Sequence, residues 1–323
     1  MTLPTRSLLL LALATAACNG ASDDSTTPDT PNANGQQLTG NKNKSYTKTK
    51  YPIVLAHGLF GFDKVFGLEY FYNVPPDLES GGAKVYLTQV SAENSTEIRG
   101  EQLLKQVERI AAMNGGKVNL IGHSQGGMDA RYVMGVRPDL IASLTTVGSP
   151  HKGADFADFV LANTTPGGFT ATLLATFGNA IGELIDLTTG EPQDITAALG
   201  TLSAPGAAAL IKKYPAGIPT TACGEGAPTN GAIPLYSWTG TSKLTNPLDL
   251  GDVFLGLTSL VYTGDNDGLV GQCSAHFGKV LRDSYDMNHL DEVNGLIGLT
   301  SFFETDPIAV YRAHANRLAT AGL

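Results

Sequence analysis

Residues 117–136 read KVNLIGHSQGGMDARYVMGV, and this stretch decides the fold. Its first five residues form a short, largely apolar run that predicts a buried β-strand. Residues 122–126 (GHSQG) follow as a G-x-S-x-G motif, and a helix-forming stretch comes next. A strand, a sharp turn and a helix in this order lift a serine hydroxyl above the edge of a sheet, and the turn requires small neighbours. The stretch therefore predicts a nucleophile turn with Ser124 as its reactive side chain.

The first half of the chain alternates between strand-like and helix-like patterns. Short apolar runs predict further buried strands at residues 52–56, 83–88 and 143–147. Residues 96–116 predict an amphipathic helix that ends at its closing Gly-Gly pair. The expected apolar face of this helix consists of Leu103, Leu104, Val107, Ile110 and Ala111. This alternation predicts an α/β protein, with a mostly parallel sheet covered by helices on both faces.

Composition restricts the class of protein. The chain has 323 residues, a formal net charge of −9, 16% charged residues and 42% hydrophobic residues. Intrinsic disorder needs high charge and few apolar residues, so a disordered chain is excluded. Nucleic-acid binding needs a basic surface, which this acidic balance disfavours. No run of 18 apolar residues follows the N-terminal segment, so no transmembrane span is expected in the mature protein.

Residues 1–18 have the pattern of a signal peptide: Arg6, an apolar run and then small residues. Two processing outcomes are open. Cleavage at the alanine pair before Cys18 would release an ordinary secreted protein. Residues 15–18 (TAAC) are also similar to a bacterial lipobox, in which Cys18 would be lipidated and tether the protein to the outer membrane. We therefore expect export from the cytoplasm in either case.

Residues 19–50 predict a disordered tether. They consist mainly of Asn, Ser, Asp, Thr, Pro, Gly and Lys, with Leu38 as the single large aliphatic residue. Such a segment buries too little apolar surface to offset the entropy lost on ordering. One folded domain is expected at residues 51–323, which carry 16 basic and 27 acidic residues and are more acidic than the whole chain.

A serine nucleophile needs a general base, and the base needs an acid that orients it. In folds with this turn the chain order is serine, acid, histidine. Three histidines follow Ser124 at a useful distance. His314 lies in a helix-like terminal stretch and His276 in a short strand or turn, whereas His289 lies in a polar loop that leads into a helix. We expect His289 to be the base.

The acid is expected on a loop that follows a late strand. Asp267 lies in such a turn, residues 263–268 (TGDNDG), after an apolar run. Asp265 in the same turn is the rival, and aspartate is also common in turns for local hydrogen bonding. The residues favour Asp267 and leave Asp265 open.

Taken together, these motifs resemble the bacterial true lipases of the Pseudomonas and Burkholderia type. The matching blocks occur in the family's order and span about residues 51–323. They are YPIVLAHGLFGFD, IRGEQLLKQVE, KVNLIGHSQGG, VGSPHKGAD, CGEG, LTNPLD, NDGLVGQC, MNHLDEVNGL and FETDP with YRAHANRL. Many blocks in order are far more specific than one serine motif, and the resemblance implies the α/β-hydrolase fold.

The resemblance also implies a role for each site residue. Ser124 would be the nucleophile, Asp267 the acid and His289 the base, in agreement with the motifs themselves. The oxyanion hole would be formed by the backbone N–H groups of Leu59 and Gln125. Relatives differ in the side chains at these last two positions, which leaves the backbone donors intact.

One structural calcium ion is implied by the resemblance. Its ligands would be the carboxylates of Asp249 and Asp291 and the backbone carbonyls of Gly295 and Leu299. Oxygen ligands suit this hard cation. Because Asp291 lies two residues after His289, the ion would hold the loop that carries the base.

The resemblance further implies a disulfide between Cys223 and Cys273. Closing a loop of about fifty residues is worth roughly 4 kcal/mol in the chain-entropy model. Cys273 lies six residues after Asp267, so the bridge would steady the acid loop. The third cysteine, Cys18, is the one that a lipobox would explain.

Residues 155–190 are where the family places its lid. The segment has apolar residues spaced like one helical face, which suit either a core helix or an amphipathic lid: Phe169, Leu173, Leu174, Phe177, Ile181, Leu184 and Ile185. Its position after VGSPHKGAD, as implied by the resemblance, favours the lid. Such a segment would shield the site and open at an oil–water interface.

The function implied is that of a secreted triacylglycerol lipase, which cleaves the carboxylic esters of acylglycerols through an acyl-enzyme. A carboxylesterase or polyester depolymerase with the same triad is the alternative. A noncatalytic lipid-binding protein is disfavoured, because a vestigial site should have lost a triad residue and none is lost. The family also implies a dedicated foldase during maturation, and we expect a monomer.

Overall fold

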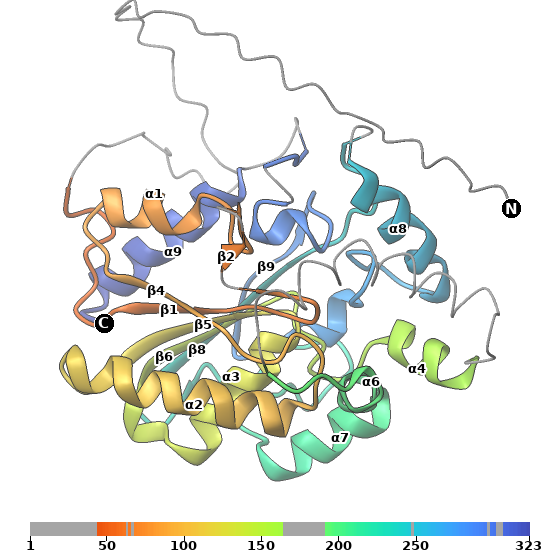
Figure 1. Ribbon diagram of the computed structural model, residues 1–323, viewed down its shortest axis with the longest axis horizontal. Coiled ribbons are helices and arrows are strands. Elements are labelled where there is room, and N and C mark those ends of the chain that lie inside the picture. The colour runs from red at the N-terminus through yellow and green to blue at the C-terminus, as the bar shows by residue number, and fades with distance from the viewer. Residues whose placement is uncertain are drawn as a thin grey trace, which may run out of the picture. The chain divides into compact units, whose positions relative to one another are not determined.

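The computed structural model describes residues 44–62, 64–65, 68–163, 191–246, 249–295, 298–301 and 306–323. Helices lie on both faces of a seven-stranded sheet (Figure 1). The strands are β1 (Ile53–Ala56), β4 (Val85–Thr88), β5 (Val118–His123), β6 (Ile141–Val147), β7 (Thr229–Asn230), β8 (Ile233–Gly240) and β9 (Lys279–Tyr285), and a separate pair joins β2 (Lys64–Val65) to β3 (Leu68–Glu69). The α-helices are α1 (Val74–Ser80), α2 (Thr96–Met113), α3 (Gln125–Val136), α4 (Asp155–Ala162), α6 (Ile195–Leu202), α7 (Ala204–Lys213), α8 (Leu250–Thr258) and α9 (Pro307–Thr320).

The strand order is β4-β1-β5-β6-β8-β7, with β9 also paired to β8. Within the seven-stranded sheet, every pairing is parallel except the short hairpin of β7 with β8. In the register, Leu55 of β1 lies between Leu87 of β4 and Ile121 of β5. Because parallel strands all end at the same edge, the loops after β1, β5 and β6 meet there. This edge carries the candidate site.

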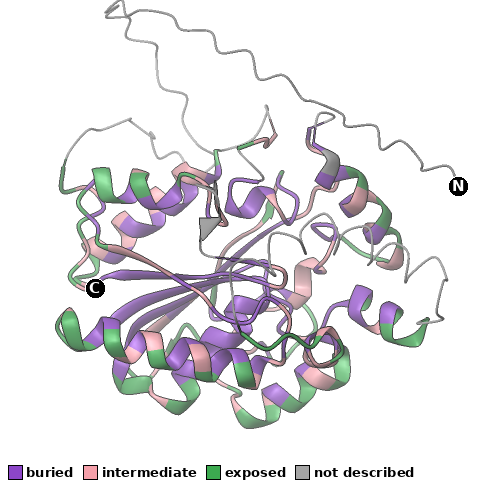
Figure 2. Ribbon diagram, viewed as in Figure 1, coloured by how far each residue is buried: buried purple, intermediate pink, exposed green. Residues whose placement is uncertain are grey.

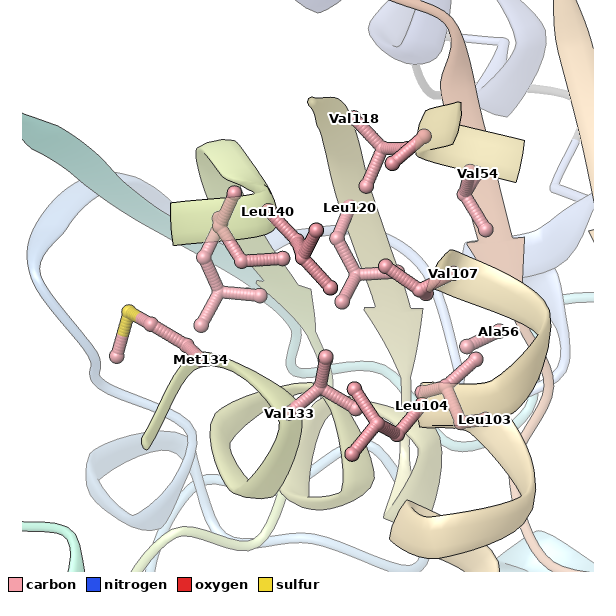
Figure 3. Packing of buried hydrophobic residues seen from close by; sticks show 14 of the residues in the cluster. Val54, Ala56, Leu103, Leu104, Val107, Val118, Leu120, Val133, Met134 and Leu140 are labelled. Carbon is pink, nitrogen blue, oxygen red and sulfur yellow. The ribbon is translucent and has the colours of Figure 1, made fainter. Parts of the chain in front are cut away.

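Side chains alternate between the two faces of the sheet, because a strand has a side-chain period of two. Val54 and Ala56 of β1 belong to the cluster that packs against α2 and α3 (Figure 3). Ile53 and Leu55 belong to the cluster on the opposite face, which includes residues of α1 and α9. The central strands are therefore buried on both sides (Figure 2).

The predicted α/β class and its mostly parallel sheet are confirmed. All four predicted strand regions contain strands, namely β1, β4, β5 and β6. The predicted amphipathic helix forms as α2, whose N-cap Ser95 accepts a hydrogen bond from the Ile98 N–H. All five residues of its expected apolar face are buried. Local periodicity was sufficient here because each element buries the face that its sequence marks.

The folded region begins earlier than composition predicts. Within the segment assigned to the tether, residues 44–50 lie against the domain. Thr47 is fully buried; its hydroxyl donates to the Leu78 carbonyl at 2.6 Å and its N–H to the Gly81 carbonyl at 3.0 Å. Hydrogen bonds to the backbone order this polar segment, so residues 44–50 belong to the described domain rather than to a disordered tether.

Several predicted features lie outside the described residues. They are the signal peptide at 1–18 with Cys18, the tether up to residue 43, and residues 164–190 of the predicted lid. Within the described part of the chain, no single helix is both long and apolar enough to cross a membrane; the bent pair α6 and α7 meets that measure only jointly.

Candidate active site

The nucleophile turn forms where β5 meets α3. Ser124 is the N-cap of α3 and adopts φ 56° and ψ −129°, a conformation that residues with a side chain rarely occupy. A Cβ atom at Gly122 would lie 2.3 Å from the carbonyl oxygen of Gly126, and one at Gly126 would lie 2.4 Å from that of Ala56. Only glycine fits these two positions. The packing of the turn therefore explains the G-x-S-x-G spacing.

Asp267 and His289 form a hydrogen-bonded pair in the buried part of the site. Nδ1 of His289 lies 2.8 Å from Oδ2 of Asp267, and the His289 N–H donates to the Asp267 carbonyl at 2.9 Å. The other oxygen, Oδ1, accepts from the N–H groups of Leu269 at 2.9 Å and Val270 at 2.7 Å. The carboxylate is thus fixed in the orientation that an imidazole-orienting acid requires.

His289 approaches the nucleophile turn through the residue before Ser124. The ring centroids of His123 and His289 lie 4.6 Å apart. Between the described atoms of Ser124 and His289 there is no hydrogen bond. Hydrogen bonds between nucleophile and base are often long without substrate and tighten only in the Michaelis complex.

The rival residues have other partners. His276 lies 3.1 Å from Asp283 and also contacts the Gly224 carbonyl. His314 hydrogen-bonds to Thr145 at 2.8 Å, and burial lowers its pKa to about 3. Asp265 is exposed in its turn, whereas Asp267 is fully buried. The geometry therefore favours His289 and Asp267.

The loop after β1 passes directly over the nucleophile. A Cβ atom at Gly58 would lie 2.6 Å from Cβ and 3.1 Å from Oγ of Ser124, so only glycine allows this approach. Leu59 follows at once, and Phe60 has a positive φ of 56°. Gln125 opens α3, so its N–H belongs to the first turn, which has no intrahelical acceptor. The two expected oxyanion donors, Leu59 and Gln125, lie on the segments that flank Ser124.

The side chain of Arg99 in α2 hydrogen-bonds to the backbone of this loop. Its Nη2 donates to the carbonyls of His57 at 2.7 Å and Gly58 at 3.3 Å. Its Nη1 donates to the carbonyls of Ser91 and Ala92, and its Nε donates to Oδ2 of Asp129 at 2.8 Å. Arg99 is fully buried, as is Asp129. The guanidinium thus orients the peptides that lead into Leu59.

A second buried chain of polar groups runs beside the base. The Tyr70 hydroxyl lies 2.7 Å from Nδ1 of His123, and Nε2 of His123 lies 3.2 Å from Oε2 of Glu292. The same Oε2 lies 3.9 Å from Nδ1 of His289. Burial lowers the pKa of His123 well below its ordinary value, so this ring is neutral. Burial and the nearby Asp267 raise the pKa of Glu292 well above its ordinary range.

Ligand atoms of His123, His289 and Glu292 lie within 4.8 Å of one another, close enough to hold a metal ion. Both ring nitrogens of His123, Oε2 of Glu292 and Nδ1 of His289 already have hydrogen-bond partners within the site. A metal ion bound there through Nδ1 of His289 would displace the hydrogen bond to Asp267. The donor set is therefore better suited to orienting the base than to holding a resident ion.

The residues implied as calcium ligands lie near the loop of the base. Asp249 and Asp291 are buried, and Oδ2 of Asp249 and Oδ1 of Asp291 have no hydrogen-bond partner. Burial, with a smaller contribution from the carboxylates of Asp252 and Asp249, raises the pKa of Asp291 to about 7. A Cβ atom at Gly295 would lie 3.1 Å from the Leu299 carbonyl oxygen, which places these two segments in contact. Buried carboxylate oxygens without a donor fit a hard cation.

Cys223 and Cys273 are joined in a disulfide with a sequence separation of 50. The implied pairing is confirmed. Cys273 lies in a short 3₁₀ helix, Gln272–Ser274, and the Gln272 N–H donates to the Asp265 carbonyl at 2.9 Å. The bridge therefore anchors the segment that follows the acid turn.

Four residues of the site were not predicted: Arg99, Tyr70, His123 and Glu292. Glu292 lies three residues after His289, which a helical reading of that loop would have placed on the same side. Arg99 stands among the apolar-face positions of α2, and a charge at such a position signals a buried partner. Tyr70 has no local signal in its sequence neighbourhood.

Comparisons with known proteins show the family to which the chain belongs. The model of the alpha/beta hydrolase fold family matches residues 51–292. A relative from Vibrio cholerae serotype O1, named triacylglycerol lipase, is 52% identical over 284 residues, covering 87% of this chain and 91% of the relative. Proteins of the same name from Burkholderia plantarii and Pseudomonas fragi are 40% and 38% identical; they cover 86% and 85% of this chain, and 88% and 98% of their own lengths are matched.

Solved structures share the fold at lower identity. A metagenomic carboxyl esterase has a TM-score of 0.60 at 17% identity, covering 84% of this chain and 76% of the esterase. A mature lipase of Bacillus licheniformis has a TM-score of 0.55 at 19% identity, covering 78% of this chain and 88% of that lipase. The sheet topology, the nucleophile turn and these relatives lead to one conclusion: the chain belongs to the α/β-hydrolase family, among its bacterial lipases.

Proposed function

We propose that the protein is a triacylglycerol lipase that hydrolyses the carboxylic ester bonds of acylglycerols through an acyl-enzyme on Ser124. The observation that carries this proposal is the buried Asp267–His289 pair beside the nucleophile turn. The substrate class is supported by relatives named triacylglycerol lipase at 38–52% identity. The triad is therefore proposed as Ser124, His289 and Asp267.

In the proposed mechanism, Oγ of Ser124 attacks the ester carbonyl while Nε2 of His289 accepts the hydroxyl proton. Asp267 accepts from Nδ1–H, which leaves Nε2 free to act as the base. The N–H groups of Leu59 and Gln125 stabilise the tetrahedral oxyanion. Collapse expels the alcohol with the proton from His289. Water activated by the same imidazole then cleaves the acyl-enzyme and releases the fatty acid.

The test is Ser124→Ala, with Ser143→Ala as the matched control at another buried serine. Loss of the nucleophile should lower kcat by about 10⁴-fold or more. The control should keep turnover within a few-fold, and urea unfolding should show that both variants fold. Turnover retained by Ser124→Ala would overturn the mechanism.

An ester panel tests the substrate class. Emulsified long-chain triacylglycerols, soluble short-chain esters and a polyester film are compared at equal active-site concentration. A lipase should show its highest rate on the emulsion. Activity confined to soluble esters, or to the polyester, would identify a carboxylesterase or a polyester depolymerase instead.

One structural calcium ion is proposed between the carboxylates of Asp249 and Asp291 and the carbonyls of Gly295 and Leu299. Support comes from the two buried carboxylate oxygens that lack a hydrogen-bond donor. The bound ion would supply positive charge to balance the carboxylates and would take part in no chemical step, while the oxygen ligands would come from the chain. Asp291 would carry its effect to the loop of His289.

Residues 155–190 are proposed as a lid. The described part of this segment is α4, where Phe159 and Leu161 are both 37% exposed. Phe177→Asp should reduce activity on emulsions more than on soluble short esters, because only the emulsion requires contact with an apolar surface. An equal loss on both substrates would indicate a core helix.

Residues 1–18 are proposed to direct export, with Cys18 as a lipid anchor in one of the two processing outcomes. Mass spectrometry of the mature N-terminus distinguishes them: a diacylated Cys18 identifies a lipoprotein, and an unmodified later residue excludes it.

A dedicated foldase during maturation and a monomeric state are further proposals. Co-expression and light scattering test them.

A further inference from the structure

Tyr70, His123 and Glu292 link the two halves of the site without belonging to the proposed triad. At one end, the Tyr70 hydroxyl lies against Gly58, where a Cβ atom would be 2.9 Å from the hydroxyl oxygen, and Gly58 belongs to the loop that covers Ser124. At the other end, Glu292 lies three residues after His289 in the loop of the base. His123 stands between them and contacts both.

His123 also touches the base itself. The centroids of the His123 and His289 rings are 4.6 Å apart. Its position in the chain is fixed by the nucleophile turn, because it is the residue before Ser124. One ring therefore contacts the loop of the base, and through Tyr70 it reaches the oxyanion loop.

The residues around Glu292 hold its carboxyl group in position and leave room for its contact with His123. Oε1 of Glu292 accepts from the Gly240 N–H at 2.6 Å and from the Thr239 hydroxyl at 3.0 Å. A Cβ atom at Gly148, which has φ 50°, would lie 1.9 Å from Oε2. A buried polar chain of this kind is costly compared with apolar packing, and it is retained where orientation matters.

We propose that His123 is a positioning residue for ester hydrolysis, holding the oxyanion loop through Tyr70 and the loop of the base through Glu292 and His289. This inference rests on the proposed roles of Ser124 and His289. The reaction needs the oxyanion donors and the base in one mutual geometry, and a displacement of about 1 Å can cost 100-fold in rate. His123 touches neither substrate nor proton in this role.

Two substitutions separate the two links. The amide of His123→Gln can reach the Nε2 position and pair with Glu292, but the contact with Tyr70 is lost. The shorter His123→Asn keeps a polar group at the Nδ1 position for Tyr70 and loses the contact with Glu292. The matched control is His314→Gln, which alters another buried neutral histidine with a hydroxyl partner, Thr145, outside the site.

The measurements are kcat and KM on a soluble ester, the rate of Ser124 phosphonylation by a phosphonate ester, and urea unfolding. We expect His123→Asn to lower kcat about 100-fold and His123→Gln about 10-fold, with KM within two-fold. Phosphonylation should slow in parallel. His314→Gln should lose stability and leave kcat unchanged.

A double-mutant cycle gives the sharpest result. Tyr70→Phe and His123→Gln cut the same link, so the double variant should be no slower than the slower single variant. The positioning role would be overturned if the two single losses of kcat multiplied in the double variant, or if the single variants kept the wild-type kcat. If His123→Asn does not fold, this cycle decides alone. Failure of the proposed function is distinguishable, because Ser124→Ala would then retain turnover and phosphonate would not label Ser124.

Discussion

The oxyanion side and the base side of the site are held together by opposite kinds of charge. On the oxyanion side, the buried guanidinium of Arg99 binds one carboxylate and four carbonyls. On the base side, the buried carboxylates of Asp249, Asp252 and Asp291 gather near His289, and two of their oxygens have no donor. Among the described residues, Arg99 is the cation that pairs with the carboxylate of the oxyanion side, and no cationic side chain pairs with the three carboxylates of the base side.

This difference indicates how each side becomes rigid. A buried charge is tolerated when a counter-charge and hydrogen bonds surround it. Arg99 meets that condition through Asp129. On the base side, Asp252 is satisfied by the N–H groups of Thr245 and Asn246 and by Asn288, whereas Asp249 and Asp291 are not. The chain alone therefore preorganises the oxyanion side, whereas the base side would need the proposed calcium ion to balance its carboxylates.

Among the changes that test how the two sides are held, removal of the Arg99 guanidinium should have the largest effect. Arg99→Met leaves Asp129 buried without a partner and frees the carbonyls of His57 and Gly58. We expect kcat on a soluble ester to fall about 100-fold or more, and the free energy of unfolding to fall by about 3–5 kcal/mol. Urea unfolding and active-site titration measure both quantities. Arg312→Met, which breaks the partly exposed pair with Asp77, is the control and should leave kcat unchanged. A folded Arg99→Met enzyme with normal kcat would show that Arg99 does not hold the oxyanion side in its active geometry.

Removing the proposed calcium ion should act on the other side, and its effect should depend on pH. Burial raises the pKa of Asp291 to about 7, against about 3.9 in an unfolded chain. Between these values the folded protein binds more protons than the unfolded chain, so without calcium the free energy of unfolding falls as pH rises. This loss in the free energy of unfolding is absent below about pH 4 and complete above about pH 7, where it reaches roughly 4 kcal/mol.

Urea unfolding at pH 5 and pH 8, with EDTA or with calcium, measures this dependence. Calcium should remove most of the decline because it binds the ionised carboxylates. Magnesium is the control, since it demands a smaller and stricter coordination shell. Equal stability with EDTA and with calcium at pH 8 would contradict the proposed calcium site on the base side.

The same contrast separates what the sequence predicts from what it does not. The strands, α2 and the nucleophile turn are local patterns, and each was predictable because a few adjacent residues determine it. The contact of Arg99 with the oxyanion loop spans about forty residues, and the contact of His123 with Glu292 spans 169. Such contacts depend on how the elements pack, which periodicity does not encode. The ordering of residues 44–50 was missed for a related reason, since it rests on hydrogen bonds rather than apolar burial.

The disulfide should stabilise the acid turn without tuning its chemistry. Replacing Cys223 and Cys273 together by serine opens a link of 50 residues. We expect a loss of about 2–4 kcal/mol in the free energy of unfolding, with kcat within two-fold at 25 °C. Urea unfolding and ester hydrolysis measure the two effects. A large loss of kcat in the folded variant would show that the bridge holds Asp267 in place. The acid turn would then depend on a single contact, as the oxyanion loop depends on Arg99.

The smallest effect is expected at Asp265, two residues before the acid and in the same turn. Its side chain is exposed, and the hydrogen bond that it makes with the Gln272 N–H uses its backbone carbonyl. Asp265→Asn should therefore change kcat by less than two-fold and the free energy of unfolding by less than about 0.5 kcal/mol. The same substitution at Asp267 replaces an acceptor of the His289 Nδ1–H and should cost orders of magnitude in kcat. If the two variants lost equal activity, the acid would be defined by the turn as a whole rather than by the one carboxylate that reaches His289.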